Sequence, residues 1–296
     1  MDPAIILFGF GIGVLVGMTG MGGASLMTPL LILVFGVKPV TAIGTDILYA
    51  AVTKTVGGLQ HLRMGTVHRG IAFWMAIGSV PSAIGGVYVI EALQRAHGDD
   101  IDEIVFGMLG ATLLVVGAAT LLRTWLVPDL FKERFGLHLY PRHIFACIAI
   151  GVLTGFVIGL TSAGSGTLVA IMLIVIFRLT PARVVGTDIF HAAVLLWAAG
   201  AAHWVGGNVD FGLAANILAG SVPGVLIGGT LAAKARGGHL RVALGVVLLA
   251  SGIALATKAD GQVVVLTAAV AGLILGTLFA LALRAEVKPL EEPEDV

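Results

Sequence analysis

The sequence predicts an all-α polytopic membrane protein made of two inverted repeats, each opening with a glycine-broken helical hairpin, plus one extra C-terminal transmembrane helix. Three observations support this prediction: the composition, an internal duplication and the distribution of basic residues between loops. Hydrophobic residues make up 58% of the 296 residues and charged residues 11%, with a mean hydropathy of +1.04. Soluble domains lie well outside these values, so the chain belongs in a membrane.

A duplicated unit begins at Gly9 and extends to Pro81. Adding 142 to its residue numbers repeatedly gives the same residue type: Gly44-Thr45-Asp46 returns as Gly186-Thr187-Asp188, and Gly78 to Pro81 return as Gly220 to Pro223. The register holds for more than seventy residues without a gap. Chance does not explain such a match, so the chain contains two copies of one unit.

Several apolar stretches approach the roughly 20 residues that a transmembrane helix needs. They are residues 42–59, 70–90, 104–122, 184–202, 211–233 and 263–283, with 242–256 as a shorter candidate. Residues 5–35 and 144–177 are too long for one crossing, and each is interrupted by small residues, at 20–23 and at 162–166. Glycine clusters interrupt helices. Each long stretch is therefore either one kinked crossing or a hairpin that returns to its own side.

The basic residues in the loops distinguish these two alternatives, because cytoplasmic loops carry the excess of Lys and Arg. If each broken stretch crosses once, seven basic residues lie on the N-terminal side and nine on the other. If each is a hairpin, three lie on the N-terminal side (Lys38, Arg95 and Lys258) and thirteen on the other. The second distribution is strongly biased, so we predict hairpins, and the two repeats are then inverted.

This topology divides the chain into five segments: 1–122 as the first repeat, 123–142 as a cytoplasmic linker, 143–257 as the second repeat, 258–284 as the extra transmembrane helix and 285–296 as an acidic cytoplasmic tail. Each repeat comprises a broken hairpin and three spans. The predicted location is the inner membrane of the cell, multi-pass, with the N-terminus outside and the C-terminus in the cytoplasm. Inverted repeats with broken helices at matching positions are typical of secondary transporters, whose site lies between the repeats near the midplane.

The glycine breaks predict a binding site for an anion. A half-helix that starts after such a break directs unpaired backbone N–H groups and the positive end of its dipole into the protein. Nearby hydroxyl groups, including that of Thr28, can add donors. The candidate substrate-binding residues are Gly20, Gly22, Gly23, Ser25, Thr45, Lys54, Ser162, Gly164, Ser165, Gly166 and Thr187. We interpret Gly9, Gly13, Gly17 and their copies instead as positions of close helix packing.

Two carboxylates related by the repeat, Asp46 and Asp188, lie a few residues inside apolar spans. Tyr49 and His191 follow three residues later on the same helix face, and Lys54 lies deeper in the span of Asp46. Ionisable residues within membrane segments are costly and are functional by default. We therefore assign these five residues to charge handling or proton coupling. The alternative for the two aspartates is helix capping at the membrane surface.

Two pairs of residues mark span ends. His61 and its copy His203 are expected to be polar loop histidines, and Pro39 and its copy Pro181 are expected to open the next helix.

The order of several short motifs resembles that of the sulfite exporter TauE/SafE family. The motifs are Gly17-Met18-Thr19-Gly20-Met21-Gly22-Gly23, then Pro29, then Ala42-Ile43-Gly44-Thr45, and later His61-Leu62-Arg63-Met64-Gly65 before Gly78 to Ser82. The similarity extends over nearly the whole chain. It implies an inner-membrane permease for sulfite, organosulfonates or related sulfur-containing anions. The chain departs from the family pattern after Gly-Thr, where a small polar residue is usual and this sequence has aspartate in both copies. Two added carboxylates near an anion site suggest proton coupling.

The predicted function is therefore a secondary transporter for a small sulfur-containing oxyanion. Two alternatives are a divalent-metal or other ion permease and an intramembrane aspartyl hydrolase; the sequence has neither clustered metal ligands nor the usual hydrolase motifs. No enzyme activity, cofactor or metal is expected. The expected partners are a small anionic substrate and the lipid bilayer, without nucleic acid because the net charge is zero. Self-association into a homo-oligomer is left open.

Overall fold

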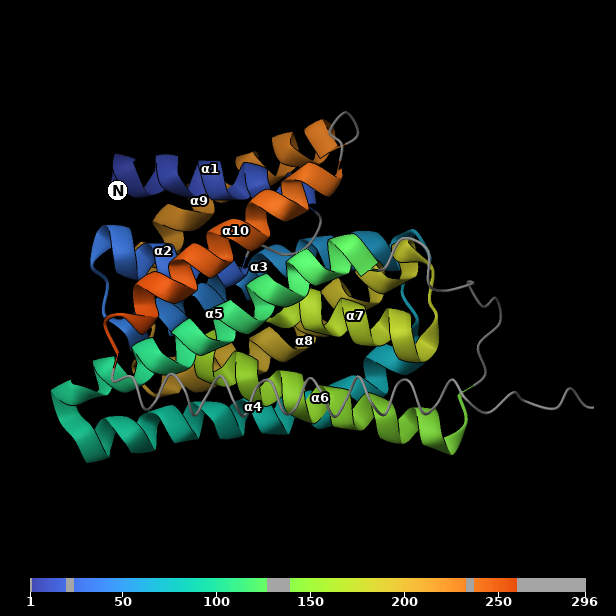
Figure 1. Ribbon diagram of the computed structural model, residues 1–296, viewed down its shortest axis with the longest axis horizontal. Helices are drawn as coiled ribbons and strands as arrows, with labels where there is room; N and C mark the ends of the chain where they lie inside the picture. The colour runs from blue at the N-terminus through green and yellow to red at the C-terminus, as the bar shows by residue number, and fades with distance from the viewer. Residues whose placement is uncertain (1, 20–23, 127–138, 233–236, 260–296) are drawn as a thin grey trace, which may run out of the picture.

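The described part of the chain, residues 2–19, 24–126, 139–232 and 237–259 of a computed structural model, is almost entirely helical and contains no strand (Figure 1). Its helices are α1 (Pro3–Thr19), α2 (Ala24–Phe35), α3 (Pro39–Arg63), α4 (Arg69–His97), the short 3-10 helix η1 (Gly98–Asp100), α5 (Ile101–Leu126), α6 (Pro141–Thr161), α7 (Ser165–Phe177), α8 (Pro181–Val205), α9 (Phe211–Ala232) and α10 (Gly237–Ala256). The all-α class predicted from composition is thus confirmed.

The helices of the two halves correspond one to one. The bounds of α3, Pro39–Arg63, become those of α8, Pro181–Val205, when 142 is added. In the same way α1, α2, α4 and α5 correspond to α6, α7, α9 and α10. Pro39 and Pro181 each occupy the first turn, as predicted, where proline costs no hydrogen bond.

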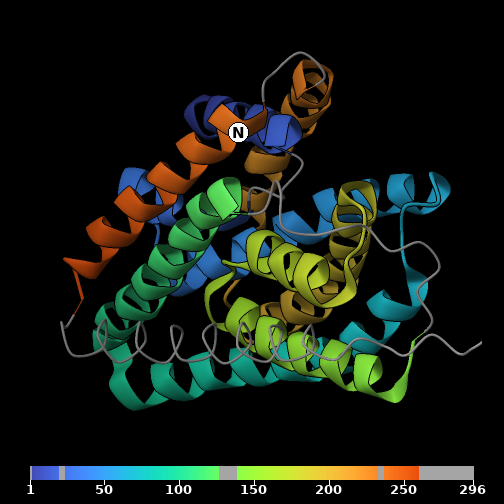
Figure 2. The same cartoon turned by 45° about the vertical axis from the view of Figure 1, so that its right-hand side comes forward.

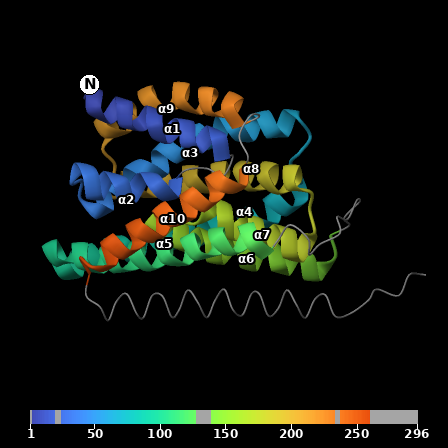
Figure 3. The ribbon, with the colours of Figure 1, turned by 45° about the horizontal axis from the view of Figure 1, so that its top comes forward.

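Helices from different halves pack against each other in a reciprocal pattern. A Cβ atom on Gly13 of α1 would lie 2.4 Å from the Ser221 carbonyl oxygen of α9, and one on Gly155 of α6 would lie 2.3 Å from the Ser79 carbonyl oxygen of α4. These two contacts are copies of each other at the 142-residue offset. The α1–α9 pair and the α4–α6 pair lie on opposite sides of the molecule (Figures 2 and 3). The close-packing interpretation of Gly13 and its copy is confirmed.

Equivalent residues also meet each other directly. The indole Nε1 of Trp197 donates a 2.8 Å hydrogen bond to the hydroxyl oxygen of its counterpart Thr55, where α8 packs on α3. Gly110 of α5 similarly faces its counterpart Gly252 of α10. Contacts between a residue and its own copy lie on a pseudo-twofold axis. Within the α3–α8 pair, residues 57–58 meet 189–190 whereas 47–48 meet Gly200, so these two equivalent helices are antiparallel.

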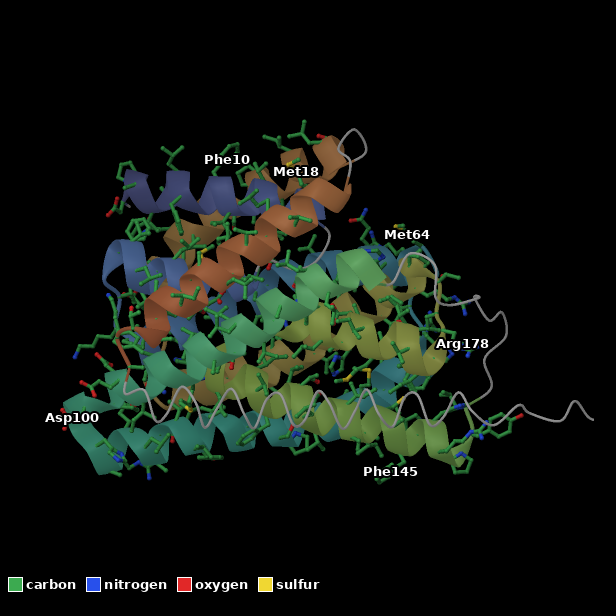
Figure 4. The ribbon with its side chains drawn as sticks, viewed as in Figure 1. Phe10, Met18, Met64, Asp100, Phe145 and Arg178 are labelled. Atoms are coloured by element: carbon green, nitrogen blue, oxygen red, sulfur yellow. The ribbon has the colours of Figure 1, made fainter. Side chains whose placement is uncertain are left out.

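Each broken stretch consists of two helices that begin and end at the same end of the molecule. Phe145, near the start of α6, and Arg178, which follows α7, both lie at the right-hand end in Figure 4. The N-terminus and the end of α2 both lie at the left-hand end in Figure 1. This course is that of a hairpin and not of one kinked crossing. At the second break, Ser162 and Gly164 adopt left-handed backbone angles, with φ of 58° and 106°.

Five of the described helices are long and apolar enough to cross a membrane: α4, α5, α6, α8 and α9. The sequence-predicted span 42–59 lies in α3, which is not among the five. Asp46, Lys54 and Gln60 lower its hydropathy. Burial explains this composition, because α3 is enclosed by other helices along its first half, where Asp46 is fully buried.

Some sequence predictions fall outside the described residues. These are Gly20, Gly22 and Gly23 of the first break, most of the linker 123–142, the extra helix 258–284 beyond residue 259, and the tail 285–296. At the edges of the linker, α5 continues to Leu126 and α6 begins at Pro141.

Candidate functional site

A carboxylate joins the two halves at the centre of the protein. Asp46 of α3 is fully buried, and its Oδ2 accepts hydrogen bonds from the hydroxyl of Thr28 at 2.5 Å and from that of Ser162 at 2.7 Å. The backbone N–H of Thr28 also faces this carboxylate. Thr28 lies near the start of α2, and Ser162 lies in the second break, just before α7. Asp46 therefore lies at the inner ends of both short half-helices.

Lys54 is the buried cation of this region, with 5% of its surface exposed. Its ammonium group interacts electrostatically with Asp188 of α8 and, less strongly, with Asp46. The adjacent residue, Thr55, meets its own copy across the pseudo-twofold axis, so Lys54 lies beside that axis. This position explains why one cation acts on both aspartates. Together Lys54, Asp46 and Asp188 form a set of three charged groups that we call the axial charge cluster.

Tyr49 and His191 occupy equivalent places beside this cluster but have different chemistry. His191 Nε2 shares a 2.8 Å hydrogen bond with the Ser79 hydroxyl of α4. Tyr49 faces Ser221 of α9, the copy of Ser79, beyond good hydrogen-bond geometry. Both side chains are buried, Tyr49 at 2% and His191 at 1% exposure. The repeat thus brings a phenol and an imidazole to matching positions.

Thr45 and Thr187 are engaged in joining the two halves. The backbone N–H of Asp210, just before α9, donates to Thr45 Oγ1 at 3.0 Å, and that of His68, just before α4, donates to Thr187 Oγ1 at 2.9 Å. Both threonines are fully buried. In each Gly-Thr-Asp tripeptide, the glycine permits close approach of the opposite half, the threonine holds that half, and the aspartate is a member of the axial charge cluster.

The second break presents a helix N-terminus to the interior. Gly164 caps α7, and Ser165 and Gly166 form the first residues of that helix. Ser25 lies in the first turn of α2, the equivalent half-helix. The first N–H groups of a helix have no intrahelical partner and favour negative charge. Also in the first turn of α7, Thr167 shares a 3.0 Å hydrogen bond with Thr120 of α5.

The described part of the site combines hydroxyl and amide donors, a buried ammonium group and two carboxylates. Among the described residues, no group of three or more His, Cys, Asp and Glu side chains is arranged to hold a metal ion. Hydroxyl and amide donors converge on Asp46, a cation lies beside the axis, and one carboxylate oxygen, Asp46 Oδ1, is buried without a hydrogen-bond partner in the described part of the chain.

A family model described as sulfite exporter TauE/SafE matches residues 5–255. The chain belongs to the TauE/SafE family. It is therefore a membrane transporter and not an enzyme, and the hydrolase alternative is set aside.

Among its relatives is the probable membrane transporter protein YjnA of Bacillus subtilis (strain 168), which is 41% identical over 255 residues, covering 86% of this chain and 100% of YjnA. The probable membrane transporter proteins YdhB and YunE of the same organism are 27% and 24% identical; the matches cover 76% and 77% of this chain and 87% and 86% of the relatives. No solved structure matches the chain.

Sequence reasoning missed two residues beside the axial charge cluster and misplaced a histidine elsewhere in this TauE/SafE protein. Ser79 and Ser221 lie in the repeated Gly-Ser-Val-Pro segment, which had served only as evidence of duplication. The Ser79 hydroxyl faces His191 and the Ser221 hydroxyl faces Tyr49, beside the axial charge cluster. The loop assignment of His203 is wrong: it is fully buried in the last turn of α8, and its Nε2 donates to the Gly159 carbonyl at 3.1 Å. His61, its copy, lies in the last turn of α3, half-buried, and its Nδ1 pairs with the Thr66 hydroxyl at 2.9 Å.

Proposed function

We propose that this TauE/SafE protein is a secondary transporter that moves a small sulfur-containing oxyanion, such as sulfite or an organosulfonate, in a proton-coupled cycle. The observation that carries the proposal is the position of Asp46 Oδ2, a carboxyl oxygen held by hydroxyl groups of both halves at the inner ends of the half-helices. Donors that hold one carboxylate oxygen there are equally suited to an oxygen of a sulfur oxyanion. Helix N-termini are common sites for such anions.

Lys54 supplies the positive charge that an anion site needs. Its position beside the pseudo-twofold axis, within reach of both aspartates, places it between the two halves. With all three groups charged, the axial charge cluster carries a net charge of minus one. Adding an anion to a buried site of that charge is costly unless a positive charge enters as well. A proton taken up by a carboxylate balances the anion, which is why we propose proton coupling.

The two halves are, in this proposal, inverted in the membrane. The antiparallel packing of α3 against its equivalent α8 supports this, because an axis perpendicular to spanning helices lies in the membrane plane. The charge distribution also supports it: Met64, which follows Arg63, and Arg178 lie at one end of the molecule, and Asp100 lies at the other (Figure 4). The end with Arg63 and Arg178 is then cytoplasmic.

Cysteine labelling tests this orientation. Cys147, the single cysteine of the sequence, is buried, so Cys147→Ala provides a background without thiols. In intact cells, a membrane-impermeant maleimide is expected to label Arg95→Cys and to label Arg178→Cys only after the membrane is opened. The reverse pattern refutes the orientation, and labelling of both positions in intact cells refutes their placement on opposite sides.

Transport in liposomes tests the substrate and the coupling. Purified protein is reconstituted, and uptake of radiolabelled sulfite, thiosulfate and a small sulfonate is measured with and without an imposed proton gradient, beside protein-free liposomes. We expect uptake of at least one of these anions to rise when the gradient is imposed. Uptake of none of them removes the anion assignment, and uptake of a divalent cation in their place moves the assignment to the alternative of an ion permease. If anion uptake is the same with and without the proton gradient, the proposed proton coupling is refuted and the anion assignment stands.

A further inference from the structure

Asp46 and Asp188 are equivalent by the repeat but have different surroundings. The two hydroxyl donors of Asp46, Thr28 and Ser162, have Ala170 and Gly20 at the corresponding positions of the other copy. The repeat therefore supplies no matching pair of hydroxyls for Asp188.

The two aspartates also differ in their interaction with the buried cation, and here Asp188 has the stronger partner. Lys54 has Leu196 as its counterpart, and the single ammonium group interacts more strongly with Asp188 than with Asp46. Divergence between the copies has thus given one aspartate neutral hydroxyl partners and the other a charged partner.

These two kinds of partner respond differently to a proton. A hydroxyl group both donates and accepts, so Thr28 and Ser162 can stay paired with Asp46 whether its carboxyl group is charged or neutral. Lys54 has no acceptor, so protonating Asp188 would leave a buried ammonium group without its stronger counter-charge. Asp46 can therefore change protonation state at a lower cost in lost interactions.

The other groups around Asp46 are consistent with this difference. On its own helix, Tyr49 and Lys54 face it. On α8, Asp188 and His191 both interact with Lys54, which in turn interacts with Asp46. The sequences of α2 and α9 contain no titratable residue, and α5 carries its titratable residues in the first turn and at position 123. Asp46 Oδ1, buried and without a hydrogen-bond partner in the described part of the chain, is free to take the proton.

We propose that Asp46 is the proton-carrying carboxylate and that Asp188 remains charged as the permanent counter-ion of Lys54. The charged Asp46 then acts as a resident anion that occupies the hydroxyls of Ser162 and Thr28. When Asp46 takes a proton from water on one side, its neutral carboxyl group holds those hydroxyl hydrogens less strongly than the carboxylate did, so the substrate anion can compete for them. When the proton leaves to the other side, the carboxylate reclaims them and favours release. The transport role of this proton rests on the proposed function; its location on Asp46 does not.

Two repeat-related variants test the proposal in liposomes. Asp46→Asn imitates the protonated carboxyl group, so we expect it to retain exchange of labelled for unlabelled anion without a gradient, and to lose gradient-driven accumulation by about tenfold or more, within the usual range of coupling between sites. We expect Asp188→Asn to lose exchange itself. The assignment is overturned if both variants retain exchange and lose accumulation equally. It is also overturned if Asp188→Asn alone retains exchange and loses accumulation.

An infrared measurement tests the site of protonation without a substrate. Acidification of the wild-type protein should produce a band from a protonated carboxyl group, which Asp46→Asn removes. Asp188→Asn combined with Lys54→Met removes both charges of that pair, so it avoids an unpaired buried lysine, and it should retain the band. A band that persists in Asp46→Asn and vanishes in the double variant overturns the proposal. If the band follows our expectation but the wild type moves no anion, the proposed function fails and the proton site stands.

Discussion

Gly155→Ala is expected to destabilise the protein by forcing two helices apart. The added Cβ would lie 2.3 Å from the Ser79 carbonyl oxygen, about 0.7 Å inside the 3.0 Å limit that real Cβ contacts essentially never pass, and 2.5 Å from the Ser82 hydroxyl oxygen. The carbonyl belongs to the backbone of α4 and cannot rotate away, so α4 and α6 must separate. Overpacking of this kind typically costs about 1–3 kcal/mol.

Gly11→Ala is the matched control. Gly11 lies in α1 and has no atom within 4 Å of the added Cβ. Both substitutions gain the same helix propensity, about 1 kcal/mol, so the difference between them isolates the overpacking cost. Gly13→Ala, the repeat copy of Gly155→Ala, meets the Ser221 carbonyl oxygen at 2.4 Å and should behave like Gly155→Ala.

Equilibrium unfolding of the purified proteins in detergent micelles, with increasing SDS, measures these differences. The expected order of stability is Gly11→Ala above wild type, and wild type above Gly13→Ala and Gly155→Ala. If Gly155→Ala is as stable as Gly11→Ala, the direct backbone contact between α4 and α6 is refuted. If only one of the two buried variants is destabilised, the reciprocity of the two interfaces is refuted.

Three further substitutions test individual contacts. Ser162→Ala removes one of the two hydroxyl donors to Asp46 and should lower stability by about 1–3 kcal/mol, because a buried carboxylate oxygen loses a partner; the same unfolding assay checks this. Thr187→Val removes the acceptor for a backbone N–H before α4 and should cost about 0.5–2 kcal/mol in stability, with substrate affinity unchanged; anion binding by calorimetry separates this structural role from direct binding. Lys54→Met leaves the buried charge of Asp188 without its cation and should cost about 3–5 kcal/mol, and adding Asp188→Asn should recover most of the loss, as a double-mutant cycle would show.

Each of these three predictions has a contrary outcome. Ser82→Ala, a hydroxyl that bonds within its own helix, is the control for Ser162→Ala, and equal losses would show that the Asp46 contact has no special role. A Thr187→Val variant of normal stability but weakened anion binding would return Thr187 to the substrate site. A double variant no more stable than Lys54→Met would contradict the pairing of Lys54 with Asp188.

The duplicated register was the most informative property of the sequence. It predicted matching helices, and Pro39 and Pro181 begin two of them at equivalent positions. The glycine breaks in turn indicated Thr28 and Ser162 as hydroxyl donors. The sequence pattern did not predict that Asp46 of the first copy accepts a hydrogen bond from Ser162 of the second copy. A pairing across halves depends on how the copies dock, and no local pattern encodes that.

The polar residues outside the membrane-embedded motifs were harder to interpret for a physical reason. A span end is ordinarily close to water, so His203 was expected in a loop. The neighbouring helix α6 covers it, and its ring bonds to a carbonyl at the end of that helix. Likewise, Thr45 and Thr187 carry hydroxyl groups of the kind that bind ligands, but each hydroxyl oxygen accepts a hydrogen bond from a backbone N–H of the opposite half. Hydroxyls serve both purposes equally well, and only the tertiary contact distinguishes them.

The reciprocal pairing of α1 with α9 has a consequence for the synthesis of the protein. The residues of α9 that complete the packing of Gly9 and Gly13 are Ile217 and Ser221, so they leave the ribosome about 200 residues later, roughly 10–40 s at usual translation rates. During that interval α1 lies in the membrane without its partner, and the first half cannot reach its final packing. Folding of this chain must therefore be completed late, after α9 has been inserted. A ribosome-stalled fragment that ends before α9 should be digested by protease within its first half, which the full-length protein protects.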